Sequence, residues 1–207
     1  MIIELVGLPG SGKSTYVENV IKENEINILS NKIYCNSRIK RNIKKTFLIL
    51  KLFFQNPKIF KTILQELNKI EFNSKKTKLK MYQYALSYAS IIIMAKKNKN
   101  VIYYMDEGII TVIWAILYNS EKSNAKIQKR LISKFGFLLG DEIIYLNTDK
   151  EIIYNRLLAR NEVGGSELQK DIKIDKKYLE KANKLLKDLC AELSENRKVN
   201  IINPKII

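Results

Sequence analysis

The sequence contains no histidine, and only two of its 207 residues are cysteine, Cys35 and Cys190. The absence of histidine excludes a histidine general base, a Ser-His-Asp triad and most zinc catalysis. The two cysteines lie far apart without paired spacing, so they fit neither a thiolate metal site nor a disulfide framework. We therefore expect two reduced thiols in a cytoplasmic protein.

The sequence also lacks an apolar run long enough to span a membrane. The longest run, Phe47–Phe54, is interrupted by Lys51, and no basic leader precedes the first apolar residues, so we expect neither a transmembrane segment nor a signal peptide. Hydrophobic residues make up 46% of the chain and charged residues 28%, a balance typical of a folded globular protein. The length favours a single domain, residues 1–207, with a core that needs no disulfide.

Acidic residues are absent from two long stretches. Residues 26–65 contain nine Lys and Arg and residues 72–105 contain seven, with no Asp or Glu in either stretch. Most of the net charge of +16 therefore lies within residues 26–105. We interpret this segment as a basic surface that faces an anionic partner. The alternative is a compositional bias that fills surfaces with Lys, although such a bias does not explain the missing carboxylates.

A phosphate-binding loop follows the first predicted strand, Ile2–Val6. Residues 7–15 read Gly-Leu-Pro-Gly-Ser-Gly-Lys-Ser-Thr, a full match to the pattern G-x-x-x-x-G-K-S/T. Glycines let backbone N–H groups turn inward around phosphates, and the N-terminus of the next helix adds partial positive charge. Lys13 is expected to reach the β- and γ-phosphates and the Ser14 hydroxyl to bind Mg²⁺, which predicts ATP and Mg²⁺ as cofactors, with GTP left open as the donor. The residues expected to bind the nucleotide are Gly7, Pro9, Gly10, Ser11, Gly12, Lys13, Ser14 and Thr15.

A pair of carboxylates follows the apolar strand predicted at Val101–Met105. In a parallel sheet the carboxyl end of each strand opens onto the ligand crevice, so Asp106 is expected near the phosphate loop, where it would hold Mg²⁺. Glu107 is expected to orient or deprotonate an acceptor hydroxyl, as a carboxylate base does in phosphoryl transfer. The structural alternative is that Asp106-Glu107-Gly108 is a turn that caps the next helix.

Arginine is scarce beside lysine, so the position of each arginine carries information. Arg156 and Arg160 lie on one face of a predicted helix, ahead of a polar, glycine-bearing segment. They predict a lid at about residues 160–176 that closes over the phosphates and neutralises charge in the transition state. The alternative is ion pairing at the surface with Glu151 or Glu162.

Two further arginines, Arg38 and Arg41, follow the second predicted strand, Asn27–Cys35, inside the carboxylate-free stretch. Because guanidinium groups bind phosphate as a planar fork, we expect both to clamp an anionic acceptor, within a basic helical region at about residues 36–98. Arg130 and Arg197 are interpreted as solvated surface.

Elsewhere, predicted strands alternate with predicted helices, which indicates a parallel sheet with helices on both faces. The polar segment 161–175 is expected to form a mobile loop. The expected helices are 39–70 with a break at Asn56-Pro57, 77–97, 109–118, 125–139, 149–160 and 176–195, and the remaining strands are 142–146 and 198–202.

These motifs resemble the P-loop nucleoside and nucleotide kinases, and most closely their thymidylate-kinase-like branch. The resemblance rests on residues 7–15, on the strand that ends at Asp106-Glu107-Gly108, and on Arg156-x-x-x-Arg160 after the next strand. It implies a three-layer α/β sandwich, the fold of P-loop NTP hydrolases, with a five-stranded parallel sheet of order 2-3-1-4-5 and a lid after the fourth strand. It also implies that the acceptor binds between the segments that follow strands two and three, where the basic segment lies.

Two features differ from the usual pattern of that family. Those kinases usually carry an arginine after the acidic residue that ends the third strand, where it contacts an acceptor phosphate, whereas this chain has Glu107 there. No Glu-Pro pair follows the second strand. We therefore expect a family member with a different acceptor.

The favoured function is a kinase that transfers the γ-phosphate of ATP to a small acceptor: a nucleotide, a nucleoside, a sugar phosphate or a cell-envelope precursor. One alternative is an ATP-binding protein that binds nucleic acid through residues 26–105, with interleaved aromatic side chains as stacking platforms, although their spacing fits a helical core equally well. Another is a kinase that docks on membranes through the basic, apolar segment Lys44–Phe54 and acts on a lipid-linked acceptor. The simpler interpretation of this segment is a buried helix that covers the sheet. The aromatic residues considered as stacking platforms for nucleic acid are Tyr34, Phe47, Phe53, Phe54, Phe60 and Phe72. The oligomeric state of the protein is left open.

Overall fold

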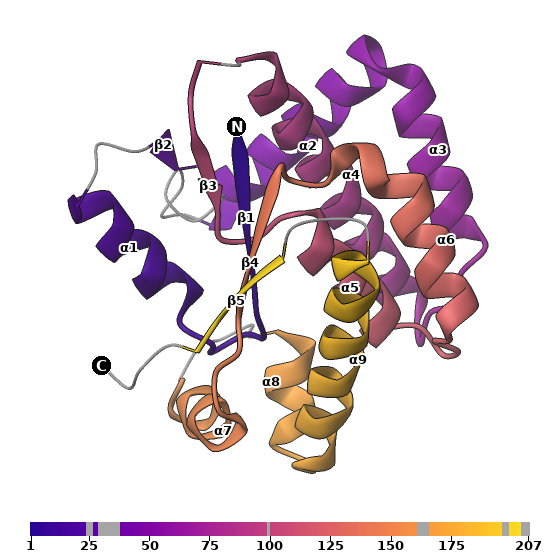
Figure 1. Cartoon of the computed structure of the whole chain (residues 1–207). Helices are drawn as coiled ribbons and strands as arrows, with labels where there is room; N and C mark the ends of the chain where they lie inside the picture. Colours follow the sequence, from indigo (N-terminus) through magenta and orange to yellow (C-terminus); the bar gives the residue numbers. More distant parts are fainter. Residues whose placement is uncertain (24–26, 29–37, 99, 161–165, 196–198, 204–207) are drawn as a thin grey trace.

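The chain folds around a parallel sheet whose strands run through the middle of the molecule (Figure 1). Every strand pair in the sheet is parallel, and the strands are hydrogen-bonded in the order β2-β3-β1-β4-β5. The strands are β1 (Ile2–Val6), β2 (Asn27–Ile28), β3 (Tyr103–Met105), β4 (Glu142–Leu146) and β5 (Val199–Ile202). The computed structural model describes residues 1–23, 27–28, 38–98, 100–160, 166–195 and 199–203.

Helices cover both faces of this sheet, with α1 on one face and α5 and α9 on the other (Figure 1). The predicted α/β fold, a parallel sheet between helices, is therefore confirmed. The helices are α1 (Lys13–Glu23), α2 (Arg38–Gln55), α3 (Pro57–Asn68), α4 (Lys75–Lys97), α5 (Ile109–Tyr118), α6 (Ala125–Phe135), α7 (Lys150–Ala159), α8 (Glu167–Ile172) and α9 (Lys177–Ser194), with a 3₁₀ turn, η1, at Gly136–Leu138.

The central strand β1 supplies side chains to both faces because alternate residues of a strand point to opposite sides. Ile2 and Val6 belong to the large core under α5 and α9, and Ile3 and Leu5 belong to a smaller core that includes Val17 of α1. All five residues of β1 are buried, so the phosphate loop begins at the end of a fully enclosed strand.

Helix α5 lies in the interior, where nine of its ten residues are buried. Its N-terminus is held by the carboxylate of Glu4, a fully buried residue of β1. Glu4 accepts hydrogen bonds from the backbone N–H of Ile110, at 2.5 Å, and of Gly140, at 3.3 Å. A buried carboxylate is stable only when such donors surround it, and a negative charge is favourable at a helix N-terminus.

The structure corrects one expectation about the elements and covers another only in part. The described part of the predicted strand Asn27–Cys35 is β2, and residues 29–35 lie outside the described residues. The predicted loop 161–175 contains α8, because Ser166 caps this helix and Leu168 is buried beneath it; residues 161–165 lie outside the described residues.

Two side-chain expectations also change or gain detail. Arg130 is not solvated surface, because its Nε lies 3.1 Å from Oε2 of Glu66, a carboxylate buried in α3. Cys190 is a free, buried thiol, and its burial raises the pKa of the thiol to about 12. Cys35 and Arg197 lie outside the described residues.

A search of the described residues finds no helix that is both long and apolar enough to cross a membrane.

We expect Gly108→Ala to destabilise the fold by about 1–3 kcal/mol through overpacking. A Cβ at this position would lie 2.2 Å from Cδ of Glu4. Glu4→Ala should cost about 1–3 kcal/mol, because the N–H groups of Ile110 and Gly140 lose their acceptor. The double variant should cost less than the sum of the two, since the clash disappears with the side chain. Urea denaturation measures the three free energies of unfolding.

The matched control is Gly136→Ala, where a new Cβ would meet nothing within 4 Å. Its backbone is already helical, at φ −54° and ψ −32°, so we expect little or no loss of stability. Strictly additive effects of the Gly108 and Glu4 substitutions would contradict the packing described here.

Candidate active site

The phosphate loop connects β1 to α1 and depends on two glycines in the left-handed region. Gly10 has φ +89° and Gly12 has φ +92°, conformations that residues with a Cβ rarely adopt. Between them, Ser11 is buried, and its backbone N–H donates to the carbonyl oxygen of Leu8 at 3.0 Å. The loop thus has the turn geometry that the sequence pattern predicts.

The ammonium group of Lys13 lies against this loop. Its Nζ donates to the carbonyl oxygen of Gly7 at 2.7 Å and to that of Leu8 at 3.1 Å. These two bonds fix the charge beside the turn that the glycines form. The helix that begins at Lys13 adds the partial positive charge of its N-terminus.

The loop is held from the other side by residues that follow β4. The hydroxyl of Thr148 donates to the carbonyl oxygen of Ser11 at 2.8 Å, and Thr148 is buried. Nη1 of Arg156, on α7, donates to the carbonyl oxygen of Gly10 at 3.3 Å. Arg156 therefore lies at the phosphate loop, and its predicted role in neutralising phosphate charge stays a prediction. Thr148 was not among the predicted residues, because a single threonine in a loop gives no recognisable pattern.

The two predicted carboxylates lie where β3 ends. The register of the sheet pairs Met105 with Glu4 of β1, so Asp106 lies beside the last residues of the strand that leads into the phosphate loop. Asp106 is buried and Glu107 is half-buried. Both carboxylates thus lie at the same edge of the sheet as Lys13.

Glu107 is held by two tyrosines of α4. Its Oε2 accepts a hydrogen bond from the Tyr88 hydroxyl at 2.7 Å and a longer one from the Tyr84 hydroxyl at 3.3 Å. The two rings pack edge to face, with centroids 4.9 Å apart. Burial, followed by the nearby charge of Glu107, raises the pKa of both tyrosines well above the usual value. They therefore remain hydrogen-bond donors even at alkaline pH near 10.0, where an ordinary tyrosine ionises. Sequence reasoning missed this pair, although the i, i+4 spacing of two tyrosines on one helix face was visible.

The segment expected to act as a lid has a structured base. The buried side chain of Gln169, on α8, donates to the carbonyl oxygens of Leu157 at 3.3 Å and Arg160 at 2.9 Å, and so closes the end of α7. Glu167 of α8 accepts a hydrogen bond from Lys80 of α4 at 2.8 Å, and this contact is the main cause of the lowered pKa of Glu167. The side chain of Arg160 is exposed.

The alternative for the two lid arginines was ion pairing with Glu151 or Glu162. Glu151 pairs instead with Lys176, at 2.5 Å, and Glu162 lies outside the described residues.

The predicted acceptor-binding arginines, Arg38 and Arg41, belong to the first turn of α2. Their side chains lie outside the described part of the structure. Their role stays a prediction.

The aromatic residues proposed as stacking platforms do not form one surface. Phe72 is buried and Phe60 is half-buried, whereas Phe47, Phe53 and Phe54 are exposed on α2. Tyr34 lies outside the described residues. Nucleic-acid binding stays a prediction, with fewer side chains available to it.

The donor set at this edge fits a nucleotide phosphate with Mg²⁺. Ser14 is exposed at the start of α1 and Asp106 is at the end of β3, and both offer the hard oxygen ligands that Mg²⁺ prefers. Ser11 has a buried hydroxyl without a hydrogen-bond partner, inside the same loop. Within the described ranges, no three His, Cys, Asp or Glu side chains gather to hold a metal ion. A Mg²⁺ ion here would therefore need phosphate oxygens in its coordination shell.

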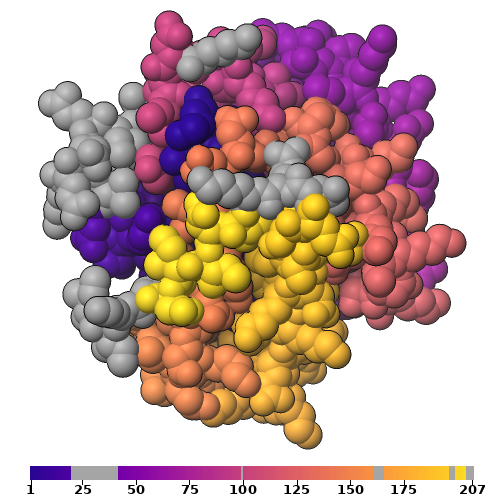
Figure 2. All heavy atoms as spheres, in the orientation of Figure 1, coloured from indigo at the N-terminus to yellow at the C-terminus, as the bar shows by residue number. Residues whose placement is uncertain are grey.

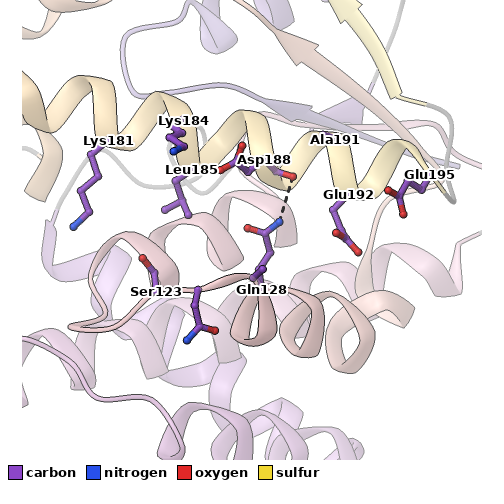
Figure 3. Close-up of a pocket in the computed structure, with 11 residues that line it drawn as sticks. Ser123, Gln128, Lys181, Lys184, Leu185, Asp188, Ala191, Glu192 and Glu195 are labelled. Atoms are coloured by element: carbon purple, nitrogen blue, oxygen red, sulfur yellow. Dashed lines mark hydrogen bonds between the residues drawn. The ribbon is translucent and has the colours of Figure 1, made fainter.

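A separate groove of about 530 Å³ lies between α6 and α9 (Figure 3). Its walls carry both signs of charge, with Lys181 and Lys184 at one end and Glu192 and Glu195 at the other, and Gln128 donates to the backbone of Asp188 across it at 3.2 Å. None of the predicted site residues lines this groove. The candidate site is therefore the edge of the sheet at the phosphate loop.

A comparison with protein families identifies a model described as an AAA domain that matches residues 2–189, which is most of the chain. The chain belongs to the AAA domain family. No curated protein matches the sequence.

Solved structures of deoxyadenosine kinase from M. mycoides share the fold of this AAA domain protein. The structure with the products dCMP and dCDP has a TM-score of 0.56 and 17% identity, over 98% of this chain and 90% of that chain. The structure with bound dATP has a TM-score of 0.52 and 17% identity, over 98% of this chain and 91% of that chain. The family match covers most of the chain, and the shared fold agrees with the predicted α/β fold of P-loop proteins.

We expect Tyr88→Phe to lower the free energy of unfolding by about 1.5–3 kcal/mol at neutral pH, because the hydrogen bond that it removes ends on a charged, half-buried carboxylate. Tyr82→Phe, on the same helix, is the matched control. It removes a hydrogen bond to the neutral Asn68 amide at the surface, so the loss should be about 1 kcal/mol or less. Equal losses in the two variants, measured by urea denaturation, would contradict a special role for the bond to Glu107.

The raised pKa values of Tyr84 and Tyr88 also predict a dependence of stability on pH. Below the usual tyrosine pKa of 10.0 both hydroxyls are protonated in the folded and the unfolded chain, so they contribute no slope. Above that value the unfolded chain loses these protons and the folded chain keeps them, so the free energy of unfolding falls by about 1.4 kcal/mol per pH unit for each group. The fall should be shallower in Tyr88→Phe than in the parent chain, measured by urea denaturation at a series of alkaline pH values. Parallel slopes would show that Tyr88 ionises with an ordinary pKa.

Proposed function

We propose that the protein is a phosphotransferase that uses Mg²⁺ and ATP to phosphorylate a small acceptor. The acceptor that we favour is a nucleoside, and the second candidate is a nucleotide. One observation supports this proposal most strongly. Lys13 and the two left-handed glycines lie at the same edge of the sheet as Asp106 and Glu107. That edge is where open parallel sheets bind their ligands.

In this proposal the phosphate loop binds the triphosphate. The loop N–H groups and Lys13 hold the β- and γ-phosphates, and Mg²⁺ would be held by Ser14 and Asp106 and would supply charge neutralisation between the phosphates. Arg156, which already contacts the loop at Gly10, is positioned to neutralise charge on the transferred group. Arg160 would join it from a lid at about residues 160–176 whose base, α8, is fixed by Gln169.

The acceptor would lie against α4, inside a basic region of about residues 36–98. Glu107 is the group proposed to orient or deprotonate the acceptor hydroxyl, and Tyr84 and Tyr88 fix its carboxylate in position. Arg38 and Arg41, at the start of α2, would donate hydrogen bonds to the acceptor, and would bind its phosphate if the acceptor is a nucleotide. In this proposal the whole chain, residues 1–207, works as one kinase domain.

Two observations favour a nucleoside. Two solved structures that share the fold are of a deoxyadenosine kinase. A carboxylate at position 107 also repels an acceptor phosphate at the point where an arginine would attract it, whereas it accepts a hydrogen bond from a neutral hydroxyl.

The test is ADP formation from Mg²⁺-ATP with a panel of deoxynucleosides, ribonucleosides, nucleoside monophosphates and sugar phosphates. We expect stimulation by at least one nucleoside, and a loss of about 10³-fold or more in Lys13→Ala, because positioning and electrostatics supply most of the catalysis in phosphoryl transfer. Lys187→Ala, an exposed lysine on α9, is the matched control and should keep full activity.

Two outcomes would count against the proposal. Turnover that survives Lys13→Ala in folded protein would exclude the phosphate loop as the catalytic site. Stimulation by monophosphates alone would retain the kinase and overturn the choice of a nucleoside as acceptor.

A further inference from the structure

Helix α2 carries a row of large apolar side chains on its outer side. We call Ile43, Phe47, Leu50 and Phe54 the α2 stripe; their exposed fractions are 65%, 64%, 50% and 75%. Their spacing of four, three and four residues places all four on one face of the helix. Large apolar side chains this exposed, in contiguous positions, mark an interaction surface.

The stripe is not needed to hold the helix in the fold. The opposite face of α2 contains Leu48 and Leu52, which are 4% and 1% exposed, and the helix packs against α3 and α4. The expectation of a buried helix over the sheet is therefore wrong for the outer half of α2. At its end the Phe53 ring packs edge to face on Phe60 of α3, with centroids 5.2 Å apart, so the surface is firmly supported.

The charge on this helix has one sign only. The α2 sequence contains six Lys and Arg and no Asp or Glu. No Asp or Glu occurs anywhere in residues 26–65. At about 100° per residue, Lys44 and Lys51 lie directly beside the stripe. The surface is thus apolar along its centre and basic along its edge.

This combination decides between possible occupants. A second copy of the chain would bring two such helices together, and the like charges along them would repel. A protein that binds an extended or helical peptide offers a groove, whereas the stripe lies on the outer side of a helix. The interface of an anionic lipid bilayer has an apolar interior beneath negatively charged headgroups. Such an interface matches both the apolar stripe and the basic residues along its edge.

We propose that α2 docks the protein on anionic lipid bilayers, with the α2 stripe at the boundary between headgroups and acyl chains and Lys44 and Lys51 at the lipid phosphates. In Figure 2 the purple segment that contains α2 and α3 lies at the upper right, away from α7 at the bottom. The proposal does not depend on phosphotransfer, because it concerns a different face of α2 from the one packed on α4, and it is tested without nucleotide.

The experiment measures co-sedimentation of the full chain with vesicles of phosphatidylcholine alone and of an equimolar mixture with phosphatidylglycerol. We expect binding to the mixed vesicles that weakens with salt, and little binding to the neutral ones. Phe47→Ser with Phe54→Ser should lower the partition coefficient by about tenfold or more. Lys44→Gln with Lys51→Gln should lower it by about fivefold for each lysine.

The matched control replaces two exposed apolar residues elsewhere, Phe137→Ser with Ile174→Ser, which are 48% and 80% exposed in the parent chain. It should bind as the parent does, and thermal melting checks that all variants are folded. No binding to mixed vesicles at low salt, or unchanged binding after loss of Phe47 and Phe54, would overturn the proposal. So would a dimer in light scattering that the same double substitution dissociates, since the stripe would then join two copies.

Discussion

The buried carboxylate of Glu4 is the constraint on which the site depends. It lies in the middle of the central strand, three residues before the phosphate loop, and binds the N–H groups that start α5 and precede β4. Removing a charge from water costs several kcal/mol unless donors replace the water, so the strand, the helix and the β4 entry must stay together. Gly108, which packs on this carboxylate, follows Asp106 and Glu107 directly. The fold therefore fixes both carboxylates relative to the loop.

The second level of organisation is preorganisation of the loop itself. Lys13 holds two of its carbonyl oxygens, Thr148 holds a third and Arg156 a fourth, from elements that follow two different strands. Because each of these carbonyl oxygens accepts a hydrogen bond, the backbone conformation of the loop is fixed. Such a site needs little rearrangement when charge develops in a reaction, and this is where electrostatic catalysis gains most.

Most of the features that the sequence predicted are local in the chain. The phosphate loop, the break between α2 and α3 at Pro57 and the carboxylates after β3 follow from adjacent residues, so their patterns are visible without a structure. Tyr88 meets Glu107 only because α4 packs beside β3, and nothing in the spacing of those two residues indicates the contact. Helix α8 was missed because its segment is short and polar, and its stability comes from burial of Leu168 against the rest of the protein.

The basic segment also acquires a different meaning once its residues are placed. The segment does not form one continuous basic surface. Lys80 forms an ion pair with Glu167 of α8, and another of its residues, Phe72, is buried in the core. Helix α2 itself contains no Asp or Glu, its first turn follows the second strand, and its outer face carries the stripe. In the proposed function the start of α2 would lie beside the acceptor, and its outer face lies at the surface of the molecule. A cation beside apolar surface is favoured at a lipid interface, and a cation at the start of α2 would bind an anionic acceptor such as a nucleotide, so one acid-free sequence would satisfy both proposed roles. Selection for either requirement would exclude Asp and Glu from α2, which a general bias toward lysine does not.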